Sequence, residues 1–410
     1  MPTPSATADA VVVGGGTVGA WCAYFLRQAG VDQVVLLEKR SLGQGASSRA
    51  AGIVRTQGGT TWAVQLGEWS RTFYLSQHER LGIDSGFTPQ GYVLPCFSQA
   101  DVAAARARMG MQNALGLAVR WLEPDELDRL NPTLAPGLTC GGTYCAQDGY
   151  LTPPRNVTAY AVALATSGVV VRERTAFTGL AVRGGRVTGV QTSRGPIESP
   201  LVVLTGGPEL AEVAGLAGIS VPAGGVRHQV AVTEPHPDLD PSRLPMMFDL
   251  SAGLYWRPEE KGLLFGMSNP DEQPGPGNCI DDDYLARMRK RLAELVPVTR
   301  GLALRRVWAA TIDYTPDHLP IIGPAFIDDQ IHNEVTVASA GGAGMMWGPA
   351  VARAASDVAL TGSSDVVDTA VLGLDRFDAD GHSRLATDPI ALPFPAHAPP
   401  APGKLWKDRP

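Results

Sequence analysis

The sequence predicts an α/β protein of two domains (α+β in its two-domain arrangement). A Rossmann-like nucleotide-binding domain is interleaved with a domain built on a mainly antiparallel sheet. Three observations predict this fold class. The first fifty residues alternate strand, helix and strand patterns around a glycine-rich turn. Short strand-like runs within 168–205 are separated by Gly-Gly and Gly-Pro pairs, and further strand candidates lie within 226–317.

The N-terminal unit has the periodicity of a βαβ element. An apolar strand at residues 10–13 is followed by a helical pattern over 18–29 and a second strand at 34–38. This pattern predicts a βαβ unit, the element with which nucleotide-binding domains of this fold class begin.

The turn between the first strand and the helix carries a dinucleotide-binding pattern. Gly14 permits a tight turn, Gly16 lets the backbone approach a pyrophosphate, and Gly19 lets the helix pack against the strand. The helix N-terminus then faces the negative charge. Glu38 closes the second strand, where a carboxylate can accept hydrogen bonds from ribose hydroxyls. Strand, turn, helix, strand and Glu38 together predict a dinucleotide site, against the alternative of a glycine turn in an unrelated α/β protein.

The domains are expected to be discontinuous, since a strand at 201–205 returns to the first sheet late in the chain. A helix is expected around 101–111 in the other domain. The predicted nucleotide-binding domain consists of 1–60, 151–225 and 318–377, the second domain of 61–150 and 226–317, and a proline-rich tail of 378–410. The composition of the tail favours an extended, poorly packed segment to which we assign no fold.

Composition excludes several classes of protein. The 410 residues carry a net charge of −7 without a long basic run, so nucleic acid is not an expected partner. Five scattered cysteines without a C-x-x-C spacing argue against a disulfide framework or a metal site and favour the reducing cytoplasm. No export signal is visible. The uncharged stretch 335–352 is interrupted by glycines and Pro349, which predicts a strand, a loop and a helix rather than a membrane span. The oligomeric state stays open.

Four blocks of sequence follow one another along the chain in a characteristic order. They are the N-terminal turn with Glu38, Gly-Ala-Ser-Ser-Arg at 45–49, Leu-Val-Val-Leu-Thr-Gly-Gly at 201–207, and Tyr-Thr-Pro-Asp-His-Leu-Pro-Ile-Ile-Gly at 314–323 followed by Gly-Gly-Ala-Gly at 341–344. Over residues 8–377 the chain resembles the D-amino-acid oxidase family of flavoenzymes, particularly its sarcosine oxidase and glycine oxidase-like branch.

The resemblance implies FAD as the cofactor. Sarcosine oxidases attach the flavin through a cysteine at the position of Ala310, so we predict non-covalent FAD here. The expected cofactor-binding residues are Gly14, Gly16, Thr17, Val18, Gly19, Glu38, Lys39, Arg40, Ser47, Ser48, Arg49, Phe177, Thr205, Gly206, Gly342, Gly344 and Met345.

The resemblance also implies oxidation of a C–N bond in an amino acid or a secondary or cyclic amine. A hydride equivalent would pass to flavin N5, and the resulting imine would hydrolyse in water. Leu264 stands where sarcosine oxidases carry a lysine that favours reaction with oxygen, so oxygen or another electron acceptor stays open. The alternatives are a 2-hydroxyacid dehydrogenase that oxidises a C–O bond, a flavin monooxygenase, and a non-enzymatic flavin-binding module.

Four residues are candidates for the substrate site. Arg55 follows the cofactor loop where sarcosine oxidase-like enzymes place a carboxylate-binding arginine; the alternative is a solvated or loop-bracing arginine. Tyr255 and Arg257 alternate onto one face of a strand, and the family often carries a tyrosine at the first position. Arg257 has the alternative of being solvated. Met346 replaces a second carboxylate-binding lysine of sarcosine oxidases.

Met345, Met346 and Trp347 would give the pocket an apolar, polarisable wall, suited to a bulky amino acid or a cyclic or N-alkyl amine; simple core packing is the alternative. His228 and His318 titrate in the range of acid–base catalysts. We predict structural roles for both, because His228 lies in a strand and His318 in a turn-forming Thr-Pro-Asp context.

Overall fold

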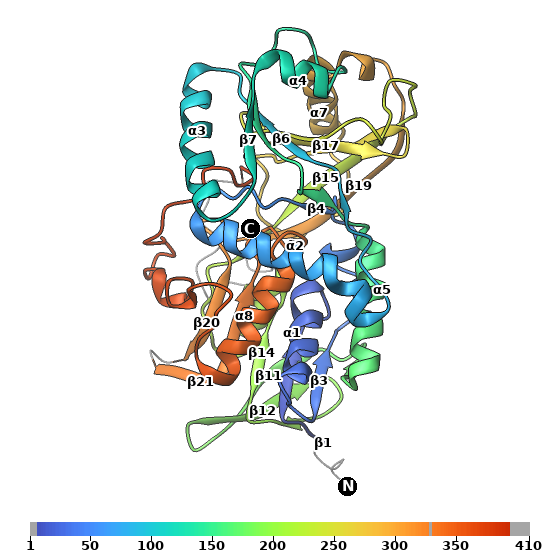
Figure 1. The fold of residues 1–410 in the computed structure, drawn as a ribbon. Helices are drawn as coiled ribbons and strands as arrows, with labels where there is room; N and C mark the ends of the chain where they lie inside the picture. The colour runs from blue at the N-terminus through green and yellow to red at the C-terminus, as the bar shows by residue number, and fades with distance from the viewer. Residues whose placement is uncertain (1–5, 328–329, 394–410) are drawn as a thin grey trace.

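The computed structural model describes residues 6–327 and 330–393. They form two bodies that follow one another along the long axis of the molecule (Figure 1). A six-stranded sheet organises the lower body in that view, and an eight-stranded sheet organises the upper one. The chain passes between the bodies repeatedly, so that each is built from segments distant in sequence. The predicted fold class is confirmed.

The six-stranded sheet has the strand order β10-β3-β2-β14-β21-β20. Its first five strands are parallel, and β20 closes one edge antiparallel to β21. The central strands consist of buried apolar residues because both faces of the sheet are covered. The strands are β2 (Ala10–Val13), β3 (Val34–Leu37), β10 (Val170–Arg172), β14 (Val202–Leu204), β20 (Ile321–Ile327) and β21 (Gln330–Ser339).

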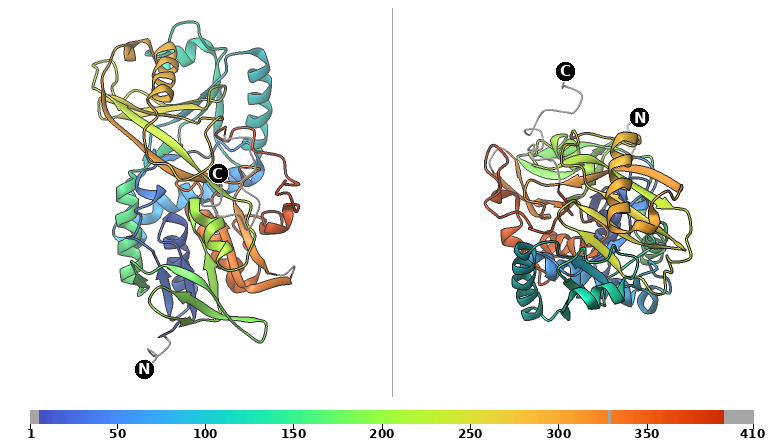
Figure 2. Two further views of the ribbon diagram at one scale, coloured as in Figure 1. Left: turned by 180° about the vertical axis from the view of Figure 1, so that it is seen from behind. Right: turned by 90° about the horizontal axis from the view of Figure 1, so that it is seen from above.

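Helices cover one face of this sheet, and a smaller sheet covers the other. On the first face α1 packs against α5 and α8 around Trp21 and Tyr160, which are fully buried. The small sheet β1-β13-β12-β11 packs with α6 on the second face, and its β11–β12 hairpin lies at the lower end of the molecule (Figure 2, left). These elements are α1 (Thr17–Gln28), α5 (Pro153–Ser167), α6 (Leu210–Gly215), α8 (Gly348–Thr361), β1 (Ala6–Thr7), β11 (Phe177–Arg183), β12 (Arg186–Thr192) and β13 (Ile197–Glu198).

The upper body is built on an eight-stranded sheet of order β19-β15-β18-β17-β16-β6-β8-β7. All neighbours are antiparallel except β16 and β6. The helix expected around 101–111 is α3, which begins where Ser98 Oγ accepts the backbone N–H of Asp101. These elements are β6 (Tyr92–Pro95), β7 (Val119–Leu122), β8 (Gly142–Cys145), β15 (Gly224–Thr233), β16 (Met246–Asp249), β17 (Leu254–Glu259), β18 (Gly262–Met267), β19 (Leu304–Tyr314), α3 (Gln99–Ala114), α4 (Pro124–Leu130) and α7 (Asp282–Leu295).

Short elements complete the two bodies. Among them, a three-stranded sheet has the order β4-β9-β5. The short elements are β4 (Ile53–Val54), β5 (Thr88–Pro89) and β9 (Gly149–Tyr150), with the 3-10 turns η1 (Ala46–Ser48), η2 (Gly207–Glu209), η3 (Pro297–Thr299), η4 (Thr369–Val371) and η5 (Leu374–Arg376).

Helix α2 (Thr61–Leu81) packs differently from its predicted domain. The boundary at residue 61 assigns it to the second domain, but its apolar face lies against α8 in the core of the lower body. Phe73 and Tyr74 are buried there, and Ser70 Oγ accepts the N–H of Ala350 at 3.1 Å. By packing, this helix belongs to the helical layer of the lower body.

The uncharged stretch 335–352 forms the end of β21, a glycine loop and the start of α8, as its glycines predict. Among the residues that the structure describes, no helix is long and apolar enough to cross a membrane.

The expectation of a poorly packed tail is wrong for residues 388–393, whereas most of residues 378–387 are exposed, as expected. Ile390 is fully buried in the cluster that contains Phe248 and Tyr255. Arg376, just before the tail, forms an ion pair with buried Asp317 at 2.7 Å, which ties the start of the tail to the lower body. The prolines exclude regular structure, but the apolar side chains between them still gain by leaving water. Residues 394–410 lie outside the described ranges.

Candidate active site

A cavity of about 600 Å³ extends from the glycine-rich turn into the eight-stranded sheet. Both bodies line it, which is why its residues come from segments far apart in the sequence. The predicted residues along it are Gly14, Gly16, Thr17, Val18, Glu38, Lys39, Arg40, Ser47, Arg49, Arg55, Phe177, Thr205, Gly206, Tyr255, Gly342, Gly344, Met345 and Met346. Gly19, Ser48 and Arg257 do not line it.

The glycine turn leaves room that side chains would fill. Gly14 has a φ of +108°, and a Cβ there would lie 2.8 Å from the Thr205 carbonyl oxygen. A Cβ on Gly19 would lie 1.9 Å from the Gly14 carbonyl oxygen, so Gly19 acts behind the turn by letting α1 approach. The bare backbone of the turn therefore fits a pyrophosphate.

Glu38 holds the turn to the next strand. Its Oε2 accepts the N–H of Gly15 at 2.9 Å, and its Oε1 accepts the N–H of Arg40 at 2.7 Å. Ser47 Oγ accepts the N–H of Thr17 at 2.9 Å at the start of α1. These contacts bring the two N-terminal sequence blocks together along the cavity.

Arg55 lies at the other end of the cavity. Its side chain is 5% exposed, and its Nη2 donates to the Ile390 carbonyl at 3.0 Å. Nε and Nη1 have no hydrogen-bond acceptor among the described residues. Because Nη2 carries a second hydrogen, one two-point edge of the guanidinium is left for a planar anion. The guanidinium also lies 5.2 Å from the centroid of the Phe248 ring. Because the buried guanidinium has lost the hydration that a solvated arginine keeps, a bound carboxylate stabilises it more.

Asp148 fixes the backbone that carries Arg55. Its buried carboxylate accepts the N–H of Thr56 at 2.8 Å and the hydroxyl of Thr56 at 2.6 Å. Gln57 donates to the same carboxylate at 3.1 Å. Burial raises the pKa of Asp148, and the hydrogen bonds from Thr56 oppose that rise. Asp148 thereby positions the arginine loop without lining the cavity.

Tyr255 and His228 form a pair in the cavity wall. His228 Nε2 and Tyr255 Oη are 2.7 Å apart, and both side chains are buried. Burial lowers the pKa of His228 to about 4 and raises that of Tyr255, so both groups are neutral near pH 7. The sequence predicted a structural role for His228 but not its contact with Tyr255. The contact arises because β15 and β17 both pair with β18, and sequence periodicity does not reveal which strands are neighbours.

Arg257 does not reach the cavity, although strand alternation directs it to the same side as Tyr255. Its Nε donates to the Ala51 carbonyl at 3.0 Å, and its Nη1 pairs with Glu259 at 2.6 Å. The guanidinium also covers the ring of Tyr150. With its donors used in this way, the side chain braces the loop after the cofactor block and lies outside the candidate site.

The remaining wall residues are mostly apolar. Met346 is half-buried on the cavity, while the neighbouring Met345 and Trp347 are 7% and 4% exposed. Ala310 lines the cavity beside His228 on the neighbouring strand, and no cysteine is found among the described lining residues. His318 also lines it, with a φ of +59° and a pKa lowered to about 4 by burial.

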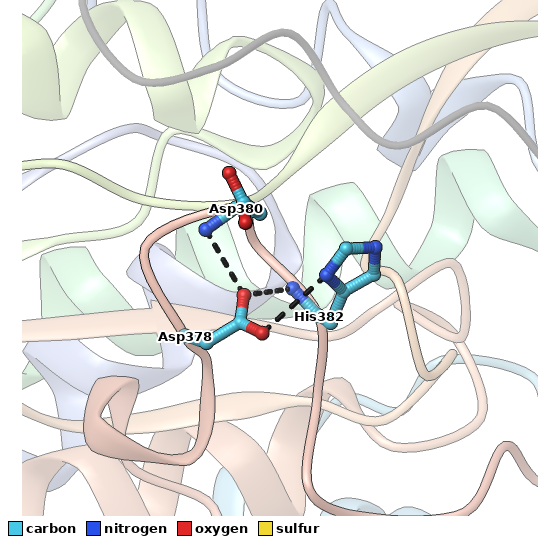
Figure 3. A group of neighbouring side chains, drawn as sticks. All are labelled: Asp378, Asp380 and His382. Carbon is cyan, nitrogen blue, oxygen red and sulfur yellow. Dashed lines mark hydrogen bonds and ion pairs between the residues drawn. The ribbon is translucent and has the colours of Figure 1, made fainter.

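A separate exposed group gathers Asp378, Asp380 and His382 (Figure 3). One oxygen of Asp378 accepts the backbone N–H groups of Asp380 and His382 at 3.0 and 2.8 Å. The carboxylate of Asp378 therefore closes a turn of the chain, and the group lies away from the cavity.

The chain is similar to known proteins over most of its length. Residues 9–358 match the DAO family, described as FAD dependent oxidoreductase. The 4-methylaminobutanoate oxidase (formaldehyde-forming) of Paenarthrobacter nicotinovorans is 27% identical over 384 residues, which cover 91% of this chain and 46% of that protein. Sarcosine oxidase subunit beta of Rhodobacter capsulatus is 28% identical over 337 residues, or 80% of each chain. The chain thus spans less than half the length of the first relative.

Solved structures support the fold. The L-proline dehydrogenase from P. horikoshii superposes with a TM-score of 0.83 at 24% identity, covering 91% of this chain and 98% of that one. The glycine oxidase from Geobacillus kaustophilus superposes with a TM-score of 0.79 at 24% identity, covering 91% and 100%. Together with the family match, these findings confirm the resemblance stated above, and the chain belongs to the DAO family of FAD-dependent oxidoreductases.

Proposed function

We propose that this protein oxidises the C–N bond of a carboxylate-bearing amine, either an amino acid or an N-alkyl or cyclic amino acid, with non-covalent FAD. The main support for the proposal is Arg55, a buried guanidinium in the same cavity as the glycine turn, with two nitrogens that have no acceptor among the described residues. A carboxylate on Arg55 would supply the missing acceptors and neutralise the buried charge.

Bound FAD supplies the acceptor for a hydride equivalent at its N5 atom. The glycine turn, Glu38 and Thr205 would hold its dinucleotide portion. Arg55 orients the substrate by its carboxylate, so that the C–H bond next to nitrogen keeps one direction in the cavity. Since Ala310 offers no nucleophile, a tether at that position is excluded.

The neutral pair of Tyr255 and His228 suits an amine substrate. Only the neutral amine has a lone pair to stabilise the carbon that loses hydride, so a group that accepts the ammonium proton assists the reaction. Tyr255 Oη can accept it while its own proton moves toward His228 Nε2, 2.7 Å away. A pKa near 4 makes His228 a weak base, which limits this role to a shared proton.

The names of relatives agree with this substrate class. They include enzymes named for 4-methylaminobutanoate, dimethylglycine and sarcosine, all N-methyl amines that carry a carboxylate. The apolar wall at Met346 favours a substrate with an apolar group beside the nitrogen. A 2-hydroxyacid would satisfy Arg55 equally well, which keeps C–O oxidation as the second candidate. We infer a cytoplasmic location from the five cysteines, all of which are free.

Anaerobic titration of the yellow protein tests the proposal. N-methyl, cyclic and primary amino acids should bleach the flavin, and the matching 2-hydroxyacids should not. Bleaching by hydroxyacids alone would show that the protein oxidises C–O bonds instead. Rapid bleaching by NADPH would indicate a monooxygenase. Admitting oxygen afterwards distinguishes an oxidase, whose colour returns at once, from a dehydrogenase that needs another acceptor.

A further inference from the structure

Residues 388–392, here called the strap, run across the substrate end of the cavity. Asp388, Ala391 and Leu392 line the cavity, and Ile390 between them is fully buried. The C-terminal part of the described chain, red in Figure 1, rises along the lower body toward the junction of the two bodies. The strap therefore belongs to the wall of the site although it follows the last regular element.

Contacts hold the strap at both ends. At its start, Asp388 donates its N–H to the Asp317 carbonyl at 3.4 Å, and Asp388 Oδ1 accepts the N–H of Ile390 at 2.9 Å. Just past its end, Ser268 Oγ donates to the Pro393 carbonyl at 2.6 Å. A Cβ on Gly59 would lie 2.0 Å from Asp388 Oδ1, so the chain can approach there only because residue 59 is a glycine.

The strap also determines how Arg55 is presented. The Ile390 carbonyl accepts Nη2 of Arg55 at 3.0 Å, which fixes the guanidinium plane and leaves its other edge for a ligand. Ile390 and Leu392 pack on the apolar cluster of Phe248 and Tyr255. Removing the strap would take away both this acceptor and one apolar wall.

The strap carries one charge into the cavity. Asp388 is 3% exposed, and its Oδ2 has no hydrogen-bond partner among the described residues. Asp388 and Arg55 both interact electrostatically with Arg108. Burial is the main cause that lowers the pKa of Arg108, while Asp388 acts to raise it and Arg55 to lower it. A ligand carboxylate on Arg55 thus lies in a compartment that already holds a buried negative group.

We propose that residues 388–392 are a specificity-determining wall, which closes the substrate compartment over Arg55 and, through the Asp388 carboxylate, rejects ligands with a second negative charge. The substrate is then an amine with a single carboxylate and a neutral or cationic far end. The inference rests on the proposed role of Arg55 as the carboxylate anchor.

Asp388→Asn tests the charge without removing the turn, because the asparagine oxygen can still accept the N–H of Ile390. Benzoate and terephthalate, which differ by one carboxylate, serve as probes of the FAD-loaded protein and are followed by the flavin absorption spectrum. The intact protein should bind benzoate about tenfold more tightly than terephthalate, the ratio that like charges a few ångström apart produce. In Asp388→Asn this ratio should fall close to one.

An unchanged ratio in Asp388→Asn would overturn the proposal, as would failure of the intact protein to bind benzoate. Neither probe is oxidised, so the result is independent of turnover. If no amine bleaches the flavin but Asp388→Asn shifts the ratio, the proposed function fails and the wall stands. If amines bleach the flavin and the ratio does not move, the wall fails alone.

Two truncations test the closure. A chain ending at Thr387 lacks the strap and should bind benzoate at least tenfold more weakly, whereas a chain ending at Pro393 keeps the strap and should bind as the full chain does. FAD content checks that both fold. Ser268→Ala, which removes only the bond to Pro393, should increase hydrogen exchange across the strap and weaken benzoate by a smaller factor. Equal benzoate affinity in both truncations contradicts the closure.

Discussion

Arg55→Ala removes the proposed substrate anchor, and its effect follows from the contacts of the guanidinium. One Nη2 hydrogen is used by the Ile390 carbonyl, so a carboxylate gains two charged hydrogen bonds at most. Each such bond contributes about 1.5–3 kcal/mol, and the loss of the guanidinium charge is screened little at 5% exposure. Allowing for imperfect geometry, the variant should lose about 3 kcal/mol, or roughly 100-fold, in apparent affinity for a carboxylate-bearing substrate.

The assay is the anaerobic rate of flavin bleaching as a function of substrate concentration. The loss should appear for an N-methyl amino acid and not for the corresponding amine without a carboxylate. Arg55→Lys should recover part of the affinity, because it restores charge without the two-point edge. Arg353→Ala, an exposed arginine on α8, serves as the control. An equal loss for both substrates, or no loss for the amino acid, would show that Arg55 does not bind the substrate carboxylate.

Three further predictions concern the cofactor, the neutral pair and stability. Gly19→Ala places a Cβ 1.9 Å from the Gly14 carbonyl oxygen and should lower the FAD bound per chain, while Gly110→Ala, with open space around it, should not; equal FAD in both would contradict the packing argument. Tyr255→Phe leaves His228 Nε2 without its 2.7 Å partner and should slow flavin reduction by about 100-fold at unchanged FAD content, measured by stopped flow; an unchanged rate would remove the pair from the chemistry. Burial holds the pKa values of His228 and His318 at about 4, against about 6.5 in an unfolded chain, so the unfolded state binds more protons between these values. The free energy of unfolding should therefore fall as the pH is lowered from about 6.5 to 4 and hold above 6.5; equal urea midpoints at pH 7.5 and 5 would exclude this effect.

Local pattern predicted the parts of the fold that local physics determines. The turn at Gly14 and Gly19 is readable because tight turns and close helix approach require glycine at fixed spacing. The strand and helix of 335–352 were likewise predictable, since glycines between apolar runs break a continuous span. The family resemblance supplied the cofactor, which local pattern leaves at the level of a dinucleotide.

Contacts between distant segments were not readable in the same way. The pairing of His228 with Tyr255 depends on which strands are neighbours. Arg257 shares a strand face with Tyr255, but the position of Ala51 and Glu259 decides where its guanidinium goes. Ile390 lies at the start of a proline-rich sequence that has no periodicity, and its burial arises from a cluster more than a hundred residues away in the chain. The apolar residues of helix α2 predict a buried face, but the sequence does not show which of the two bodies that face packs against.

The most direct test of amine oxidation is product analysis of a single anaerobic turnover. The FAD-loaded protein is mixed with an N-methyl amino acid without oxygen, and the reduced flavin and the products are counted together. Amine oxidation should give one cleaved C–N bond for each flavin reduced, with one amine and one carbonyl compound released after hydrolysis. Flavin that stays oxidised with every amine, yet is reduced stoichiometrically by a 2-hydroxyacid with release of the 2-oxoacid, would contradict it.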